Sequence, residues 1–330
     1  MEGDNFVLPG TKRVPSLFAA GCFYFLAVAG KPLIELFELG LLRLYKNVGG
    51  VEPDGALFGA ILTIAYYLCF CLLPLLFYAR RHPGIGEYMR IKPAGLSAAL
   101  AGVGAGIAGF FLCIHANTLW ILLIEALGGT VPDGGSLQME NAGDVVRYLL
   151  LTAILPALCE ELLFRGAILS AWEEKGSRKA ILITALLFTL LHSRFAGMPA
   201  ELISGLILGF LVVITGSLMT GIIYHTVHNS MAIWLTLLTA GQEETGGSAF
   251  EDIGGAAGLI LVLVRIAVYA AALFLLFRFL KLRYGTKALE RPAVPGEEKG
   301  VCEWTVWFCG ALLALALYST DILTVIGVLR

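Results

Sequence analysis

The sequence has 330 residues, of which 58% are hydrophobic and 15% charged, and its formal net charge is −2. Its mean hydropathy is +0.82, and its charged share lies well below the roughly 25% of an average soluble domain. This balance excludes an ordinary soluble globule and offers no basic surface for nucleic acid. It predicts an integral membrane protein whose surroundings are the lipid bilayer.

Nine apolar segments follow one another along the chain, and each is close to the length that a membrane-spanning helix needs, about 20 residues. The sequence therefore predicts an all-α fold, a polytopic transmembrane helical bundle of about eight to nine spans. The expected spans are residues 14–30, 56–78, 96–124, 145–170, 179–195, 199–215, 217–240, 256–280 and 304–326.

The first apolar segment has two interpretations. Lys12 and Arg13 precede a run with small residues at its end, as in a cleaved signal peptide. The alternative is a retained first helix, extended by the amphipathic sequence KPLIELFELGLLRLYKN at 31–47. We favour the retained helix because so many further spans follow it.

Lysine and arginine gather in alternate loops, at 80–92, at 171–178 and in the polar linker 281–300. The loops between them, TVPDGGSLQMENAGD and GQEETGGSAFEDIGG, are acidic or neutral. Because loops rich in lysine and arginine stay in the cytoplasm, we expect a cytoplasmic N-terminus and a cytoplasmic linker.

One span carries the stretch PALCEELLFRG, with three charged residues in an otherwise apolar run. An ionisable residue inside a span costs ~2.5–3.5 kcal/mol or more, so it is a functional candidate by default. Glu161 and Arg165 share a helix face and can pair, whereas Glu160 points about 100° away. Pro156 offers no N–H to the Thr152 carbonyl and predicts a kink. A packing-only ion pair would account for Glu161 and Arg165 but leaves Glu160 unexplained.

Two later spans contain three of the five histidines of the chain, His192, His225 and His228. A single helical histidine is more often an interior packing residue, but this clustering argues against packing alone. With a rise of about 1.5 Å per residue, Glu160, His192 and His225 lie at similar depth. We expect them, with Asn229, to converge on one polar cavity.

A carboxylate beside imidazoles suits the activation of water by a general base, and a second imidazole with an amide can donate hydrogen bonds to an oxyanion. Peptide hydrolysis needs both functions, and no serine or cysteine is placed as a nucleophile. The chemistry requires no cofactor. The alternative is a divalent metal such as zinc held by Glu160, His192 and His225, although the sequence lacks HExxH.

Three ordered motifs carry a resemblance: EELLFR at 160–165, FTLLH at 188–192 and HTVHN at 225–229. They resemble the motifs EExxxR, FxxxH and HxxxN or HxxxD of the CAAX prenyl protease and bacteriocin-processing (CPBP) family. The resemblance covers 145–240, which we interpret as a catalytic helical core. N-terminal transmembrane helices occupy 1–144, and C-terminal transmembrane helices occupy 241–330.

The resemblance implies an intramembrane endopeptidase that cleaves a membrane-associated protein or peptide, in the cell membrane of a bacterium. The family is described both as glutamate-dependent and as metal-dependent, and the sequence leaves both open. The implied roles are general base for Glu160, acting with His192 on a water, oxyanion site for His225 and Asn229, and support for Glu161 and Arg165.

Two other classes of function remain open. One is a membrane immunity or binding protein that keeps the fold without proteolysis, and the other is a proton-coupled transporter, since buried carboxylates and histidines also relay protons. The presence of all three motifs disfavours the first class. The lack of inverted repeats in the sequence disfavours the second.

Overall fold

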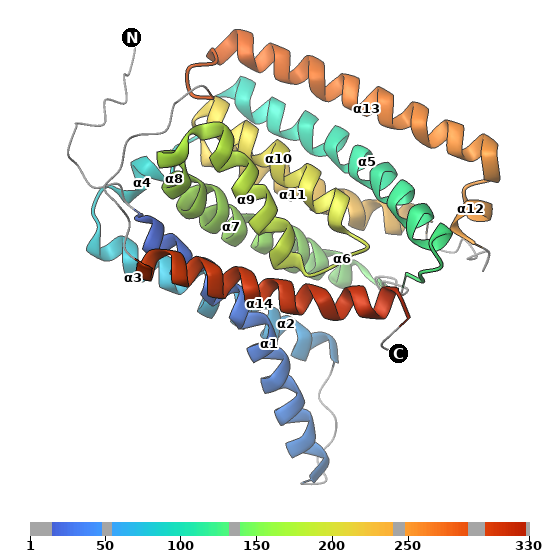
Figure 1. Ribbon diagram of the computed structural model, residues 1–330, viewed down its shortest axis with the longest axis horizontal. Helices are drawn as coiled ribbons and strands as arrows, with labels where there is room; N and C mark the ends of the chain where they lie inside the picture. The colour runs from blue at the N-terminus through green and yellow to red at the C-terminus, as the bar shows by residue number, and fades with distance from the viewer. Residues whose placement is uncertain (1–14, 48–54, 132–138, 240–247, 290–300, 328–330) are drawn as a thin grey trace.

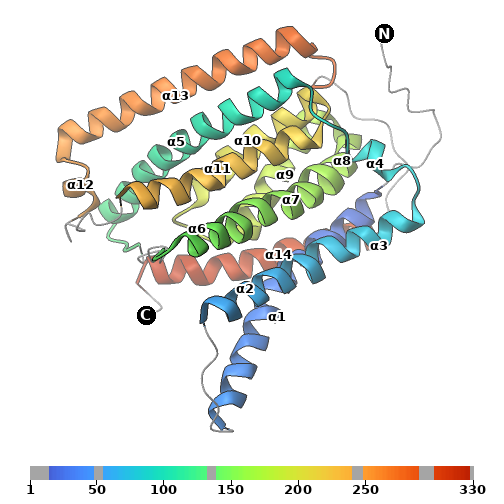
Figure 2. The same cartoon turned by 180° about the vertical axis from the view of Figure 1, so that it is seen from behind.

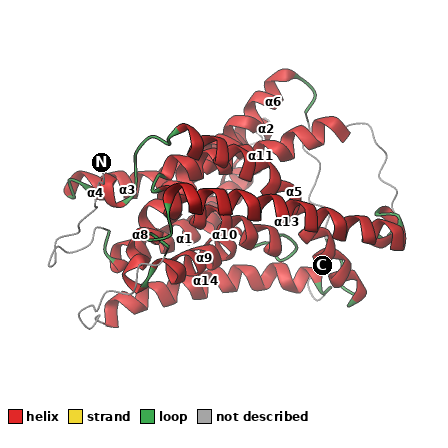
Figure 3. Ribbon diagram, turned by 90° about the horizontal axis from the view of Figure 1, so that it is seen from above, coloured by secondary structure: helices red, strands yellow, loops and turns green. Residues whose placement is uncertain are grey.

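The computed structural model describes residues 15–47, 55–131, 139–239, 248–289 and 301–327. These residues form a helical bundle (Figure 1), and no strand occurs among them (Figure 3). The predicted all-α membrane fold is confirmed. Seven segments of the described chain are long and apolar enough to cross a membrane.

The helices agree with the predicted spans to within a few residues, apart from the first. They are α1 (Leu17–Asn47), α2 (Gly55–Tyr66), η1 (Tyr67–Leu72), α3 (Leu73–Arg81), α4 (Ile85–Tyr88), α5 (Leu96–Ala126), α6 (Ala142–Tyr148), η2 (Leu149–Ile154), α7 (Leu155–Glu161), η3 (Leu162–Ile168), α8 (Leu169–Trp172), η4 (Glu173–Lys175), α9 (Ser177–His192), α10 (Met198–Thr215), α11 (Leu218–Thr239), α12 (Ala249–Asp252), α13 (Gly255–Tyr284) and α14 (Val301–Val325).

The seven segments with spanning length and composition comprise α1, α2 to α3, α5, α6 to η4, α10, α13 and α14. Two further predicted spans are α9, which has 16 residues, and α11, which has 22. These two helices carry the motif histidines. The helix α9 is shorter than a typical span, and α11 contains polar side chains, so neither resembles a purely lipid-facing helix.

The first helix is longer than the predicted span 14–30. It continues through Pro32 to Asn47, so the amphipathic extension is helical as expected. Its first half is buried in the bundle, whereas most residues after Pro32 are exposed. In Figures 1 and 2 this second half leaves the bundle together with the start of α2.

Helices α5 and α11 approach each other closely because glycines line their interface. A Cβ atom on Gly102 would lie 3.0 Å from the carbonyl oxygen of Thr220, and one on Gly106 would lie 2.9 Å from that of Tyr224. Small residues allow such backbone approach between membrane helices. The close packing holds α11, and with it the third motif, against the centre of the bundle.

The described parts of the three loops rich in lysine and arginine, residues 80–92, 171–178 and 281–289, lie at one end of the bundle (Figure 1). Arg90, from the loop after α3, forms an ion pair of 2.6 Å with Glu173 of η4. Lys92 from the same loop and Arg283 at the end of α13 line a common cavity. This end is the left side of Figure 1, and we refer to it below as the basic end.

Candidate active site

The helix that carries the two glutamates is not a regular α-helix. The segment α7, which contains Glu160 and Glu161, lies between the π-helical turns η2 and η3. Pro156 stands at the start of α7, so the predicted irregularity is present as a wide turn. Such π-helical turns shift the direction of the side chains that follow.

Glu161 and Arg165 form the predicted ion pair, with 3.0 Å between Oε1 and Nη1, and both side chains are fully buried. The same Glu161 oxygen accepts a hydrogen bond of 2.9 Å from Nδ1 of His225. Arg165 also donates to the carbonyl oxygen of Gly205 at 3.2 Å and lies 4.4 Å from the ring centre of Phe188. This pair therefore connects the glutamate helix to α9, α10 and α11.

Glu160 points away from that network, as expected from its position on the helix. Its Oε1 accepts a hydrogen bond of 2.7 Å from the hydroxyl group of Tyr67. Its Oε2 lies 3.9 Å from Nε2 of His192 and has no hydrogen-bond partner within the described parts of the chain. The residue is only 5% exposed, so one carboxylate oxygen is buried with its acceptor capacity unused.

His192 is the last residue of α9, and its side chain is 27% exposed. Its Nδ1 lies 2.8 Å from the carbonyl oxygen of Phe188. A carbonyl oxygen only accepts, so Nδ1 must be the donor, and in the neutral ring Nε2 is then an acceptor. The nitrogen that faces Glu160 is thus able to orient a polar molecule between the two side chains.

His225 is buried and has a fixed ring orientation. Because Nδ1 donates to the carboxylate of Glu161, Nε2 remains for another partner. The ring centre lies 5.9 Å from that of Phe188, which also contacts His192 at 4.5 Å. Phe188, from the second motif, thus separates and positions the two imidazoles.

Asn229 lies one turn beyond His225 on α11. Its Nδ2 donates a hydrogen bond of 3.0 Å to the carbonyl oxygen of Thr152. The described contacts of Asn229 include none with Glu160, His192 or His225. The structure therefore brings those three together around α7 and places Asn229 at the neighbouring turn of the glutamate helix.

Two residues outside the motifs reach this site, and the sequence analysis did not single them out. Tyr67 comes from η1 and binds Glu160, as described above. Lys31 of α1 donates a hydrogen bond to the carbonyl oxygen of Leu191 and interacts electrostatically with Glu160 and Glu201. The lysine in front of Pro32 was a usable signal, whereas Tyr67 resembles its apolar neighbours.

The alternative of a metal ion held by Glu160, His192 and His225 stays a prediction. No group of three or more His, Cys, Asp or Glu side chains among the described residues is arranged to hold a metal ion. The Nδ1 atoms of both histidines have partners, the Phe188 carbonyl oxygen and the Glu161 carboxylate, and this leaves only Nε2 of each ring for a further ligand. We therefore derive no chemical step through a metal ion.

The comparisons with known proteins agree with the motifs. Residues 142–231 match a family described as Type II CAAX prenyl endopeptidase Rce1-like. No curated protein and no solved structure matches the chain. The matched region runs from the start of α6 into α11 and contains Glu160, His192 and His225 with the helices that position them. The chain is an integral membrane protein, and its residues 142–231 are similar to the Rce1-like type II CAAX prenyl endopeptidases.

Proposed function

We propose that the protein is an intramembrane endopeptidase that hydrolyses peptide bonds of membrane-associated proteins or peptides by means of a water activated by Glu160. The observation that carries this proposal is the buried Glu160 Oε2, which lacks a partner among the described residues and lies 3.9 Å from His192 Nε2. A water at about 2.8 Å from each of these atoms would donate one hydrogen bond to each.

In the proposed reaction, Glu160 takes a proton from this water while the oxygen attacks the carbonyl carbon of the scissile bond. His192 holds the second hydrogen of the water through Nε2. Tyr67 binds the other oxygen of Glu160, so the base acts through Oε2. Glu160 then transfers its proton to the nitrogen of the leaving amine, and the peptide bond breaks as the tetrahedral intermediate collapses.

The oxyanion of that intermediate needs hydrogen-bond donors. Nδ1 of His225 already donates to Glu161, so Nε2 can donate only when the ring is doubly protonated. Asn229 keeps one amide hydrogen beyond its bond to Thr152. We assign His225 and Asn229 as the oxyanion site, with Glu161 and Arg165 as residues that position His225.

The proposed location is the cell membrane of a bacterium, with the N-terminus and the linker 281–300 in the cytoplasm. The basic end of the bundle would then face the cytoplasm, in agreement with the distribution of lysine and arginine between its loops.

The test is cleavage of a peptide library by the purified protein in detergent, with Glu160→Gln as the active-site variant. Glu201→Gln is a matched control, because Glu201 is also a largely buried carboxylate with an unpaired oxygen but takes no part in the proposed reaction. We expect cleavage by the wild type and by Glu201→Gln, and cleavage that is ~10²–10⁴-fold slower in Glu160→Gln.

The same assay separates the alternatives. Peptide binding without cleavage by the wild type would indicate an immunity or binding protein. Proton uptake into vesicles that depends on Glu160 would indicate a transporter. Cleavage that stops with a chelator, together with a bound metal that Glu160→Gln loses, would replace the glutamate mechanism with a metal-dependent one.

A further inference from the structure

The basic end of the bundle contains a cavity of about 700 Å³ that lies away from the glutamates. It is enclosed by the loop before α5, the turn between α10 and α11, and the end of α13. Two cationic side chains, Lys92 and Arg283, line it, and its lining includes no carboxylate. A cavity of this size can hold a small molecule or a headgroup.

Neither of the two cations has a described counter-ion. Arg90, two residues before Lys92, is paired with Glu173 at 2.6 Å, but the ion pairs of the described residues include neither Lys92 nor Arg283. Two like charges facing one volume repel each other, and an anion between them removes the repulsion. The cavity is therefore electrostatically suited to an anion.

The cavity also presents neutral donors. The hydroxyl groups of Ser97 and Tyr284 lie 2.8 Å apart, and because one hydrogen suffices for that bond, the second is available to a ligand. Gly95 precedes α5 without a side-chain cap. The Ala99 amide bonds to the Gly95 carbonyl oxygen, so the backbone amides of the first turn before Ala99 have no acceptor within the helix. A phosphate oxygen, which only accepts, suits this set of donors together with the two cations.

One wall of the cavity is apolar and open to the surroundings of the bundle. Leu96 and Leu100 line it from α5, and they are 77% and 63% exposed. In a membrane protein these side chains lie against lipid. A ligand with an anionic head and an apolar tail can therefore bind both parts of the cavity, whereas a free phosphate ion would use only one.

We propose that this cavity binds the phosphate headgroup of an anionic phospholipid, held by Lys92 and Arg283, with an acyl chain along Leu96 and Leu100. Basic pockets between membrane helices recognise such headgroups on the cytoplasmic side. The lipid would tie the end of α13 to α5 and to the turn before α11, the helix that carries His225 and Asn229.

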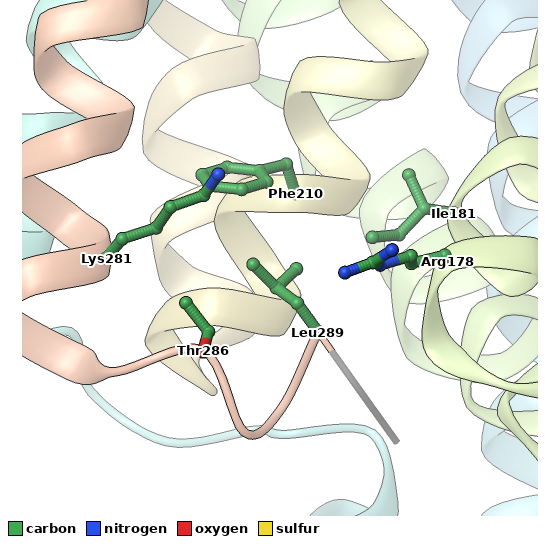
Figure 4. Close-up of a pocket in the computed structure, with 6 residues that line it drawn as sticks. All are labelled: Arg178, Ile181, Phe210, Lys281, Thr286 and Leu289. Carbon is green, nitrogen blue, oxygen red and sulfur yellow. The ribbon is translucent and has the colours of Figure 1, made fainter. Parts of the chain in front are cut away.

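A second, smaller basic cavity at the same end provides a matched control. It has a volume of about 300 Å³ and contains Arg178 and Lys281. Figure 4 shows these cations on opposite sides of Leu289. Lys281 lies 5.8 Å from the ring centre of Phe210, and Arg283 of the larger cavity lies 5.6 Å from that of Tyr284, so the two cavities are matched in this respect. Removal of the charges of Arg178 and Lys281 should weaken the general attraction of the basic end to anionic lipid and leave the larger cavity unchanged.

The test measures lipid retained by the delipidated full chain in detergent, by native mass spectrometry. The probes are phosphatidylglycerol and phosphatidylcholine with identical acyl chains, and inorganic phosphate. We expect a phosphatidylglycerol complex with the wild type. Affinity should fall about thirtyfold in Lys92→Gln/Arg283→Gln, because each cation contributes about 1 kcal/mol of attraction to an anionic lipid. Arg178→Gln/Lys281→Gln and Lys92→Arg should retain most of the affinity.

Three results would overturn the proposal. Equal losses in the two double variants would indicate attraction to the basic end as a whole instead of a built site. Equal binding of the two lipids would remove the headgroup from recognition. Inorganic phosphate that displaces the lipid at low concentration, with the same dependence on Lys92 and Arg283, would identify a free anion as the ligand. Each variant's melting temperature is measured alongside, so that a misfolded protein is not counted.

Discussion

Asn229 donates its side-chain amide to the carbonyl oxygen of Thr152, across the interface between α11 and η2. Pro156, four residues after Thr152, has no N–H to offer to that carbonyl. The third motif thus stabilises the irregular turn that precedes the glutamates. Asn229 has a structural partner in addition to its proposed role at the oxyanion, and the two roles differ in what their loss should change.

We predict that Asn229→Ala lowers the rate of cleavage ~10²–10³-fold, because it removes a donor to the oxyanion. The accompanying loss of stability should be only about 0.6 kcal/mol, the average for a hydrogen bond between membrane helices. Cleavage kinetics and the melting temperature in detergent measure the two effects.

The control is Asn117→Ala, since the Asn117 side chain also bonds to a backbone group of another helix: its Oδ1 accepts from the Ala200 amide at 3.2 Å. It should show a similar change in stability and normal cleavage. If both variants lost cleavage to the same extent, Asn229 would be a structural residue only.

Tyr67→Phe should slow cleavage by about 10- to 100-fold, because a hydrogen bond to a charged group contributes ~1.5–3 kcal/mol. The bond in question is the 2.7 Å contact with Glu160 Oε1, which fixes the carboxylate so that Oε2 faces His192. The measurement is the rate constant of cleavage at saturating substrate.

Tyr66→Phe is the matched control for this variant. The neighbouring Tyr66 hydroxyl group donates to the carbonyl oxygen of Ala27 at 3.1 Å, so its loss should weaken the contact between α1 and α2 while cleavage stays near normal. Normal cleavage by Tyr67→Phe would mean that His192 alone orients the base.

For topology, we predict that a membrane-impermeant maleimide labels Ser248→Cys in intact cells and does not label Thr286→Cys. Ser248 precedes α12 at the end of the bundle opposite the basic end, and Thr286 follows α13 at the basic end. The prediction follows from the retention of loops rich in lysine and arginine in the cytoplasm. Labelling of the parent protein gives the background, and the reverse pattern would invert the assignment.

The sequence predicted the parts of this structure that depend on local pattern. The spacing of Glu161 and Arg165 predicted their ion pair, and the apolar segments predicted the helices. Tyr67 could not be predicted, because it lies 93 residues from Glu160 in the sequence and an aromatic residue in an apolar run has no distinguishing feature. Long-range contacts of this kind are set by tertiary packing.

The irregular helix geometry also escaped prediction in detail. Pro156 predicted a kink, but the apolar pattern does not distinguish α-helical from π-helical turns, which differ by one residue in hydrogen-bond spacing. The π-helical turn η2 precedes the two glutamates and so changes the direction in which they point. We expected Asn229 to converge on one cavity with the other candidates, and its bond to the Thr152 carbonyl oxygen was not predicted. The sequence pattern does not show that this carbonyl lies in a π-helical turn.

The final prediction separates the roles of the two charged groups of the first motif. Glu160→Gln keeps the shape of the side chain and removes the base, so cleavage should fall ~10²–10⁴-fold while the melting temperature is maintained or raised. The carboxylate is buried, and its Oε2 lacks a described partner, so neutralising it removes a cost of burial.

Arg165→Ala should behave differently. It leaves Glu161 as a buried carboxylate whose described partner is then only His225, and breaking a buried ion pair costs ~3–5 kcal/mol. We therefore expect a lower melting temperature or a lower yield together with lost cleavage. Both quantities are measured for each variant in the same detergent. Near wild-type cleavage by Glu160→Gln would disprove the glutamate mechanism. An Arg165→Ala protein of normal stability would show that the ion pair with Glu161 does not hold the bundle together.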